Sequence, residues 1–152
     1  MNEATKTSKQ SVSVAAQNKE LLRKAVEEIW NNGNFDKLQE LVSDDFVIHF
    51  PRDGEEIRGP GNVKKFYTEL RKAFPDLHFT IVDLVAEGNK VVTHWSATGT
   101  HRGEFRGVPA TGKSVTFKAM DMDRIANGKF VECWTNVDEQ GLMQQLGVIP
   151  AK

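Results

Sequence analysis

The feature that most constrains this fold is a strand-like pattern that fills most of the second half of the chain. Two pairs of long, apolar-rich segments occur there, and the turns within the pairs are Gly88-Asn89 and Asn127-Gly128. Asn-Gly favours a tight β-hairpin because both central residues of such a turn adopt positive φ angles. Four antiparallel strands are therefore predicted, over residues 77–87, 90–101, 114–126 and 129–137.

The first half of the chain has helical periodicity instead. An apolar stripe with helical spacing begins near Asn18. Pro60 suits the first turn of another helix, because its missing N–H needs no partner there. The expected elements are helices over 18–33, 34–42 and 60–74, a short strand over 45–50, a charged loop over 52–59, and a last helix after Asp138.

Helices and strands that are segregated along a chain indicate an α+β fold. Three N-terminal helices can cover only one face of a strongly curved antiparallel sheet. We therefore expect a cone-shaped α+β domain in which helices and sheet enclose a pocket, followed by a short C-terminal helix. The single domain is expected over residues 17–149, after a flexible tail over residues 1–16 that is rich in Lys, Thr, Ser, Gln and Ala.

Charge and cysteine content narrow the expected partners. Twenty Lys and Arg residues oppose 21 Asp and Glu, and no basic block suggests a nucleic-acid surface. One cysteine and four scattered histidines predict neither an internal disulfide nor a metal site. No apolar run reaches the roughly 20 residues that cross a membrane, and the first ten residues lack the apolar segment of a secretory signal. We expect a cytoplasmic protein that binds a hydrophobic small molecule, with no metal, nucleic acid or membrane partner.

The Asn127-Gly128 turn also predicts a register. If Ala126 faces Lys129, then Asp121 faces Trp134, and both side chains are expected to point into the pocket. Burial raises the pKa of an aspartate toward the range of a general base, so Asp121 is the candidate catalytic residue.

Two further side chains, an indole and an imidazole, are expected in or near the pocket. Trp95 is expected to share the pocket face and to form, with Trp134, flat walls for a planar ligand. His101 lies at the end of the same strand, where it could orient a carbonyl or carry a proton.

Plainer structural interpretations of these residues stay open. Asp121 could be a rim residue that bonds to a neighbour, and the three Trp residues could be ordinary core or interface aromatics. Asp123 and Glu132 are interpreted as a solvated acidic pair near the hairpin mouth. The same register predicts an outward apolar set suited to a homodimer interface: Met120, Met122, Val131 and Cys133.

Several segments resemble the SnoaL-like polyketide cyclases and related ester cyclases of the nuclear-transport-factor-like superfamily. The run over residues 99–113, GTHRGEFRGVPATGK, is similar to a loop of that family. The resemblance covers about residues 18–148, and it implies the cone fold and ring closure by aldol condensation with an acid/base carboxylate and no cofactor. The other matching segments are residues 74–77, 121–132 and 145–147, with Trp134 and Asp138.

The resemblance places the acidic base of the family at Gly112, which cannot move a proton. It keeps the loop histidine as His101, and it places His49 where members carry polar pocket residues. We therefore expect a cofactor-independent polyketide cyclase, aldol-type lyase or isomerase that acts on a hydrophobic, carbonyl-bearing small molecule. Asp121 is the expected base and His101 its assistant, while His49, Trp95 and Trp134 are expected to position the substrate.

Two other hypotheses stay open. Gly112 favours a non-catalytic small-molecule-binding module of the same fold, since fold alone does not imply function. An isomerase or epoxide hydrolase is favoured less, because the only tyrosine, Tyr67, lies on the third predicted helix. In addition, the predicted register places Arg124 on the face opposite to Asp121 and Asp123.

Overall fold

The computed structural model describes residues 12–52 and 54–150. Its first helix begins at a serine cap. The Ser13 hydroxyl accepts a hydrogen bond from the Ala16 N–H at 3.1 Å, and helix α1 (Val14–Ala25) follows. The helix continues as one π-helical segment, η1 (Val26–Asn31). Residues 14–16, predicted as tail, are therefore helical, and residues 1–11 of the predicted tail lie outside the described residues.

The remaining elements follow the predicted order closely. Helix α3 and the four long strands occupy almost the predicted ranges, and Asp138 caps α4 by accepting a hydrogen bond from the Gly141 N–H at 2.9 Å. In the part of the chain that the structure describes, no helix is both long and apolar enough to cross a membrane. The elements are η2 (Phe35–Lys37), α2 (Leu38–Leu41), β1 (Val42–His49), β2 (Glu56–Arg58), α3 (Pro60–Ala73), β3 (His78–Glu87), β4 (Lys90–Thr100), β5 (Ser114–Ala126), β6 (Lys129–Val137) and α4 (Glu139–Gln145).

The strands form one six-stranded sheet in the order β2-β1-β6-β5-β4-β3. Strands β3 to β6 are antiparallel neighbours, as predicted. The sheet as a whole is mixed, because the early strand β1, whose pairing was not predicted, lies parallel to β6. A parallel pair needs a long connection, and here the connection contains β2, α3, β3, β4 and β5. Strand β2 lies in the segment that was predicted to be a charged loop, and it pairs with β1.

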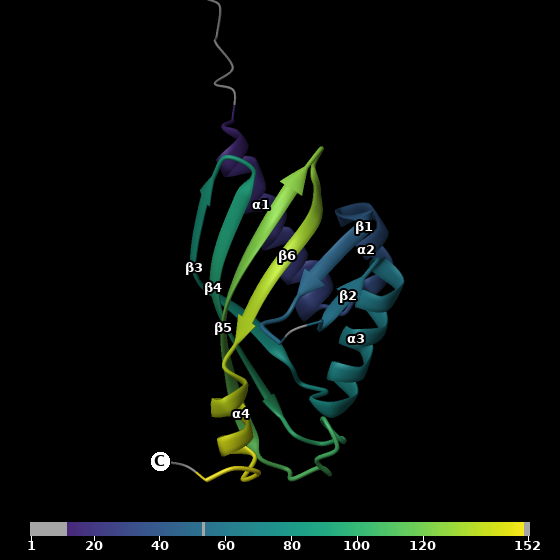
Figure 1. Cartoon of the computed structure of the whole chain (residues 1–152), viewed down its shortest axis with the longest axis vertical. Coiled ribbons are helices and arrows are strands. Elements are labelled where there is room, and N and C mark those ends of the chain that lie inside the picture. The colour runs from purple at the N-terminus through teal and green to yellow at the C-terminus, as the bar shows by residue number, and fades with distance from the viewer. Residues whose placement is uncertain (1–11, 53, 151–152) are drawn as a thin grey trace, which may run out of the picture.

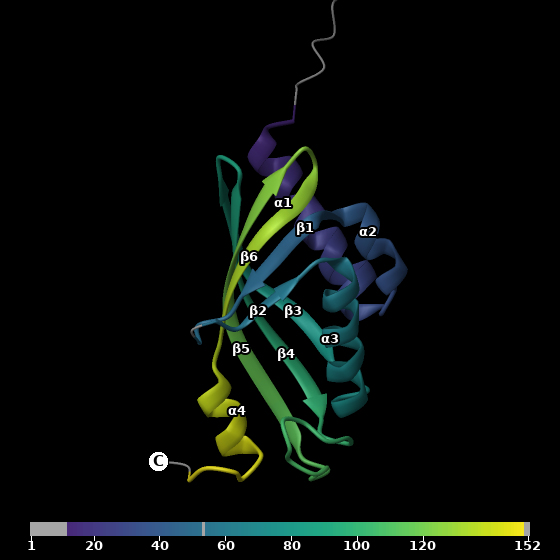
Figure 2. The ribbon, with the colours of Figure 1, turned by 45° about the vertical axis from the view of Figure 1, so that its right-hand side comes forward.

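The helices α1, α2 and α3 cover one face of the curved sheet, which we call the inner face (Figure 1, Figure 2). The core between them divides into two clusters of buried side chains. Ile29 of η1 and Val63 of α3 belong to the cluster at β1 and β6, and Phe74 at the end of α3 belongs to the cluster at the far ends of β4 and β5. The predicted cone of helices over a curved sheet is confirmed.

Hydrogen bonds from side chains fix the end of η1 beside the edge strand β3. The Asn31 side chain accepts from the Phe79 N–H at 2.7 Å and donates to the Phe79 carbonyl at 3.0 Å. The Arg71 guanidinium donates to the carbonyls of Trp30 and Asn31. These contacts leave Ile29 and Trp30 facing the sheet, because the end of η1 cannot rotate.

A β-bulge in β6 changes the predicted register. Ala126 faces Lys129 and Ile125 faces Phe130, as predicted, but Arg124 then faces Glu132, so Val131 is an extra residue. Beyond it, Asp121 faces Thr135 and not Trp134. The bulge sends Glu132 and Trp134 to the outer face and turns Cys133 and Thr135 inward.

The bulge also changes the predicted outward apolar set. Cys133 is buried and lines the interior, so its predicted place on the outer face is wrong. Met120 is 54% exposed on the outer face, and Val85 of β3 is 56% exposed. The homodimer itself stays a prediction.

The loop between β4 and β5 docks against the end of α3. The N–H groups of Arg102 and Gly103 both donate to the Ala73 carbonyl, at 2.9 and 3.1 Å. A Cβ atom at Gly103 would overlap the carbonyl oxygen of Lys72, so this close approach requires glycine. The docked loop brings Phe105 against Phe74, with 5.3 Å between ring centroids.

We expect Gly103→Ala to lower the free energy of unfolding by about 1–3 kcal/mol, because the loop must move away from α3. Gly61→Ala in the first turn of α3 is the matched control, since a Cβ atom there meets open space. The control is expected to be neutral or to stabilise by up to about 1 kcal/mol. Urea unfolding at one pH measures both changes, and equal effects of the two variants would contradict the docking argument.

Candidate functional site

The inner face and the helices enclose a hollow with two adjoining compartments. The deep compartment, about 60 Å³, lies under α1, η1 and α2, and the outer compartment, about 90 Å³, lies between α3, β5 and α4. Each compartment is smaller than the roughly 150 Å³ apolar cavity that accommodates benzene, so even a one-ring ligand must use both, and a larger ligand must extend beyond them. Six residues line both compartments: Ile48, Tyr67, Phe79, Trp95, Asp121 and Cys133.

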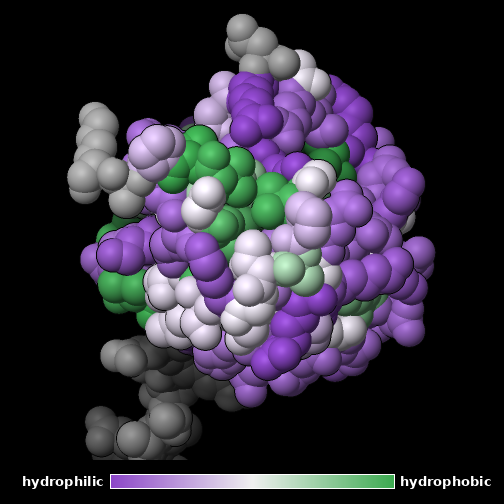
Figure 3. Space-filling model, turned by 90° about the horizontal axis from the view of Figure 1, so that it is seen from below, coloured by the Kyte–Doolittle hydropathy of each residue, from purple (hydrophilic) through white to green (hydrophobic). Residues whose placement is uncertain are grey.

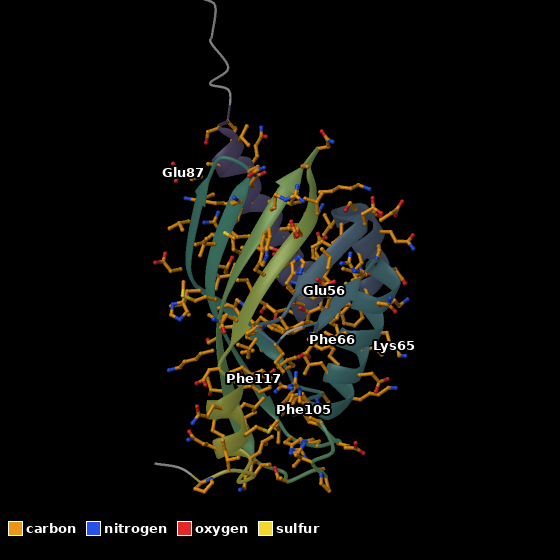
Figure 4. The ribbon with its side chains drawn as sticks, viewed as in Figure 1. Glu56, Lys65, Phe66, Glu87, Phe105 and Phe117 are labelled. Carbon is orange, nitrogen blue, oxygen red and sulfur yellow. The ribbon has the colours of Figure 1, made fainter. Side chains whose placement is uncertain are left out.

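The outer compartment is mainly aromatic, and apart from Asp121 its charged residues come from the loop and α4. Phe66 of α3, Phe105 of the loop and Phe117 of β5 lie close together between these elements (Figure 4). Arg106 and Glu139 also line this compartment and form an ion pair with 2.9 Å between nitrogen and oxygen. At the loop and α4 end of the molecule, an apolar patch is surrounded by hydrophilic residues (Figure 3). This composition suits a hydrophobic, planar ligand.

Asp121 of β5 is the polar group at the junction of the two compartments, and its predicted inward orientation agrees with the structure. Its Oδ1 accepts a hydrogen bond from the Thr135 hydroxyl at 2.5 Å, and the Trp95 side chain also donates to the carboxylate. Burial raises the pKa of Asp121 to about 6, and both hydrogen bonds act in the opposite direction by stabilising the charged form. A carboxylate with this pKa is largely ionised near neutral pH and is still a competent base.

Asp123, two residues further along β5, lines the deep compartment only. It is 7% exposed, so its interpretation as a solvated partner of Glu132 is wrong. Burial, with a smaller contribution from the charge of Asp121, raises the pKa of Asp123 to about 8, while a hydrogen bond with Cys133 acts in the opposite direction. Asp123 is therefore mainly a neutral carboxylic acid near pH 7.

Tyr67 of α3 lines both compartments and was not predicted as a site residue. Its ring packs on Trp30, with 4.0 Å between centroids. Burial and the nearby charge of Asp121 raise the pKa of Tyr67 well above its usual value, so the phenol stays protonated and can donate a hydrogen bond. The sequence does carry a signal for this position, because Tyr67 belongs to the apolar stripe of the helix over residues 60–74, and such a stripe is expected to face the sheet.

The structure removes two predicted substrate-binding residues from the hollow. His49 and Trp134 are neighbours on β1 and β6, and their rings stack at 5.5 Å between centroids on the outer face. His49 Nε2 lies 2.7 Å from Glu132 and Nδ1 lies 3.0 Å from Glu56. Neither ring lines either compartment, so their predicted role in the hollow is wrong, and the bulge in β6 is the cause for Trp134.

His101 is fully buried away from the hollow. Its Nδ1 accepts a hydrogen bond from the Thr111 N–H at 3.2 Å and lies 3.0 Å from the Thr111 hydroxyl, and its ring packs on Phe74. The contacts hold the loop over 101–113 in place, so His101 is a support for the loop and not a neighbour of Asp121. Gly112, at the position the resemblance assigns to an acid, also lies outside the lining of the hollow.

The two carboxyls predict a specific dependence of stability on pH. The pKa values of Asp121 and Asp123 in the folded state, about 6 and about 8, lie above the ordinary value of 3.8, so the folded protein binds more protons than the unfolded chain between these limits. The stability they contribute is complete below about pH 4 and is lost as the pH rises through the folded values.

We therefore expect Asp123→Asn to flatten the decline in unfolding free energy between about pH 6 and pH 8. The slope removed approaches about 1.4 kcal/mol per pH unit for one proton. Urea unfolding across this range measures it, with Asp83→Asn on the exposed face of β3 as the matched control. A slope unchanged by Asp123→Asn would contradict the burial of a neutral acid. Asp76 and Glu132, whose pKa values are lowered, do not titrate in this range.

We expect substitution of the two tryptophans of the predicted site, Trp95 and Trp134, to affect ligand affinity differently. Trp95→Phe removes a side chain that lines both compartments, and we expect it to weaken binding of β-tetralone, a planar bicyclic ketone, by about tenfold or more, as for a buried aromatic contact. Trp134→Phe should leave this affinity unchanged, because the ring lies on the outer face. Equilibrium dialysis compares the two, and an equal loss in both variants would place the ligand elsewhere.

The comparisons with known proteins agree with this architecture. The family model described as SnoaL-like polyketide cyclase matches residues 20–146. Aklanonic acid methyl ester cyclase DnrD of Streptomyces peucetius is 28% identical over 134 residues, which cover 84% of this chain and 89% of that protein. Aklanonic acid methyl ester cyclase DauD of Streptomyces sp. strain C5 is also 28% identical, and 80% of its length is covered.

Solved structures show the same fold. A SnoaL-like polyketide cyclase candidate from Jannaschia sp. CCS1 superposes with a TM-score of 0.82 at 26% identity, covering 93% of this chain and 99% of that one. AclR of Streptomyces galilaeus, described as a candidate hydroxylase, gives a TM-score of 0.80 at 30% identity, with 91% and 85% covered. Since the family model spans most of its length, the chain belongs to the SnoaL-like polyketide cyclase family.

Proposed function

We propose that this protein closes a ring in a hydrophobic carbonyl compound by proton abstraction, without a cofactor, and that Asp121 is the general base. The observation that carries the proposal is an ionisable carboxyl inside an apolar hollow that is also lined by a phenol, that of Tyr67, which stays protonated. A carbon beside a carbonyl loses its proton only when the resulting enolate is stabilised. Donors already oriented in a water-poor site provide that stabilisation.

Each side chain at the junction has a distinct role in the proposal. Asp121 takes the proton from carbon, and Thr135 and Trp95 hold the carboxylate in orientation. Tyr67, which faces the same space from α3, donates a hydrogen bond to the enolate oxygen. The aromatic side chains of the outer compartment hold the rest of the substrate. His101, expected to assist Asp121, has no part in the proposed chemistry, since it supports the loop.

The relatives support a cyclase, because two of them are named as aklanonic acid methyl ester cyclases. Proton transfer without ring closure is the second candidate. Tyr67 favours an isomerase as well, since this tyrosine lines the same two compartments as Asp121. The homodimer and the cytoplasmic location stay predictions.

The test separates these functions. Wild type is incubated in deuterium oxide with aklanonic acid methyl ester and with β-tetralone, and mass spectrometry and NMR follow ring closure and deuterium exchange beside the carbonyl. We expect Asp121→Asn to lose both by about 100-fold or more, because an amide cannot accept the proton. Asp83→Asn should keep wild-type rates.

Three outcomes are informative. Wild-type rates in Asp121→Asn would remove that residue as the base. Exchange without ring closure in the wild type would favour the isomerase. Binding of both compounds with neither reaction would identify a non-catalytic ligand-binding module.

A further inference from the structure

The chemistry proposed above leaves one buried acid in the deep compartment without a use. Asp123 lies on the same side of β5 as Asp121, and its side chain lines the deep compartment. The Thr93 hydroxyl lines the same compartment from β4, where Thr93 is the cross-strand neighbour of Asp121, and it is buried with no hydrogen-bond partner among the described residues. A buried polar atom without a partner costs free energy, so this end of the hollow is suited to an oxygen atom of a ligand.

We propose that Asp123 is the acid of the ring closure, which protonates the oxygen that becomes an alkoxide when the new carbon–carbon bond forms. The proposal rests on the proposed function and adds to it a second catalytic residue. It also states which end of the substrate enters the deep compartment. The carbonyl under attack points inward toward Asp123 and Thr93, and the carbon that loses its proton lies at the junction, beside Asp121.

The surroundings of Asp123 keep it protonated. The titratable groups that face it are Asp121 on its own strand, Cys133 on β6 and Tyr67 on α3, and none of these is a cation. The neighbouring Arg124 points to the outer face and bonds to Glu132 at 3.2 Å. A carboxylate buried without a cation is costly, so the proton stays on Asp123.

The hydrogen bonds around the two acids separate their roles. Asp121 receives bonds from Thr135 and Trp95, which favour its charged form, whereas Asp123 has only Cys133. Two neighbouring carboxyls whose surroundings drive their pKa values apart are suited to act as base and acid at one pH. The base is therefore the carboxyl at the junction, and the acid is the carboxyl in the deep compartment.

The proton balance closes without a co-reactant. The Asp121 carboxylate takes a proton from carbon as the C–H bond breaks, and the electron pair of that bond forms the new C–C bond to the second carbonyl. The π electrons of that carbonyl move to its oxygen, which takes the proton of Asp123. Asp121 is then neutral and Asp123 charged, and one proton transfer between them restores the starting state. The substrate must therefore carry two carbonyl groups, one to activate the carbon and one to be attacked.

The test separates the two steps of the reaction, proton abstraction from carbon and ring closure. For whichever substrate wild type cyclises in the preceding experiment, we expect Asp123→Asn to keep deuterium exchange beside the carbonyl within a few-fold and to lose ring closure by about 100-fold. Asparagine has nearly the same shape and can still donate a hydrogen bond, but it has no proton to transfer. Asp83→Asn is the matched control, and thermal melting of each variant checks that it folds.

A second measurement needs no turnover. Carbon-13 NMR of labelled aspartate carboxyls, assigned with the two Asn variants, should show Asp123 neutral and Asp121 ionised at pH 7. Ring closure at the wild-type rate in Asp123→Asn, or an Asp123 carboxyl that is ionised at pH 7, would overturn the proposal while Asp121 remains the base. A wild type that neither exchanges nor cyclises would instead overturn the proposed function, and this inference with it.

Discussion

One extra residue in β6 determines which side chains face the hollow. Val131 has no partner on β5, so every side chain after it changes face relative to a regular ladder. Phe130 and Cys133 can then both face inward, while Glu132 stays outside beside His49 and Arg124. A regular strand would have buried Glu132 within reach of Asp123 and would have left Cys133 outside.

The second constraint is that the hollow is apolar but contains two carboxyls on one strand. In water the two would have nearly the same pKa. Here burial raises both, and hydrogen bonds from Thr135 and Trp95 limit the rise for Asp121 alone. The polarity of the site is therefore set by neutral donors on β4 and β6, and the described lining of the deep compartment contains no cation. Such a site favours an uncharged ligand, since a carboxylate of the ligand would meet a fixed negative charge.

Much of the fold could be predicted because the signals were local. Short segments predicted these elements without any long-range information: the Asn127-Gly128 turn, Pro60 at the start of α3 and Asp138 at the start of α4. The parallel pairing of β1 with β6 could not be predicted in this way, because it joins segments more than 80 residues apart. The segregation of helices and strands predicted the cone architecture, the resemblance to the SnoaL-like family implied the same fold, and the family match agrees with both.

The site was predicted less well, for a physical reason. Asp121 and Trp95 were predicted on the correct face because they lie on β5 and β4, which pair without a register shift, whereas the bulge lies in β6. Trp134 was placed wrongly because a bulge depends on packing across the sheet and leaves no mark in the local sequence. His101 was expected to assist the base because the resemblance implies a histidine in this loop, but its contacts with Thr111 support the loop instead. Tyr67 was set aside on its location in a helix, although that helix covers the hollow.

The contact between Asn31 and Phe79 limits strand pairing between two molecules at one edge of the sheet. Strand β3 is an edge of the sheet, and an edge offers free N–H and C=O groups to which another polypeptide can add as a strand. The Asn31 amide satisfies one such pair from within the same chain, as a neighbouring strand would. An outside strand can therefore not extend the sheet past Phe79 without first displacing the end of η1, which limits edge-to-edge strand pairing at this point of β3.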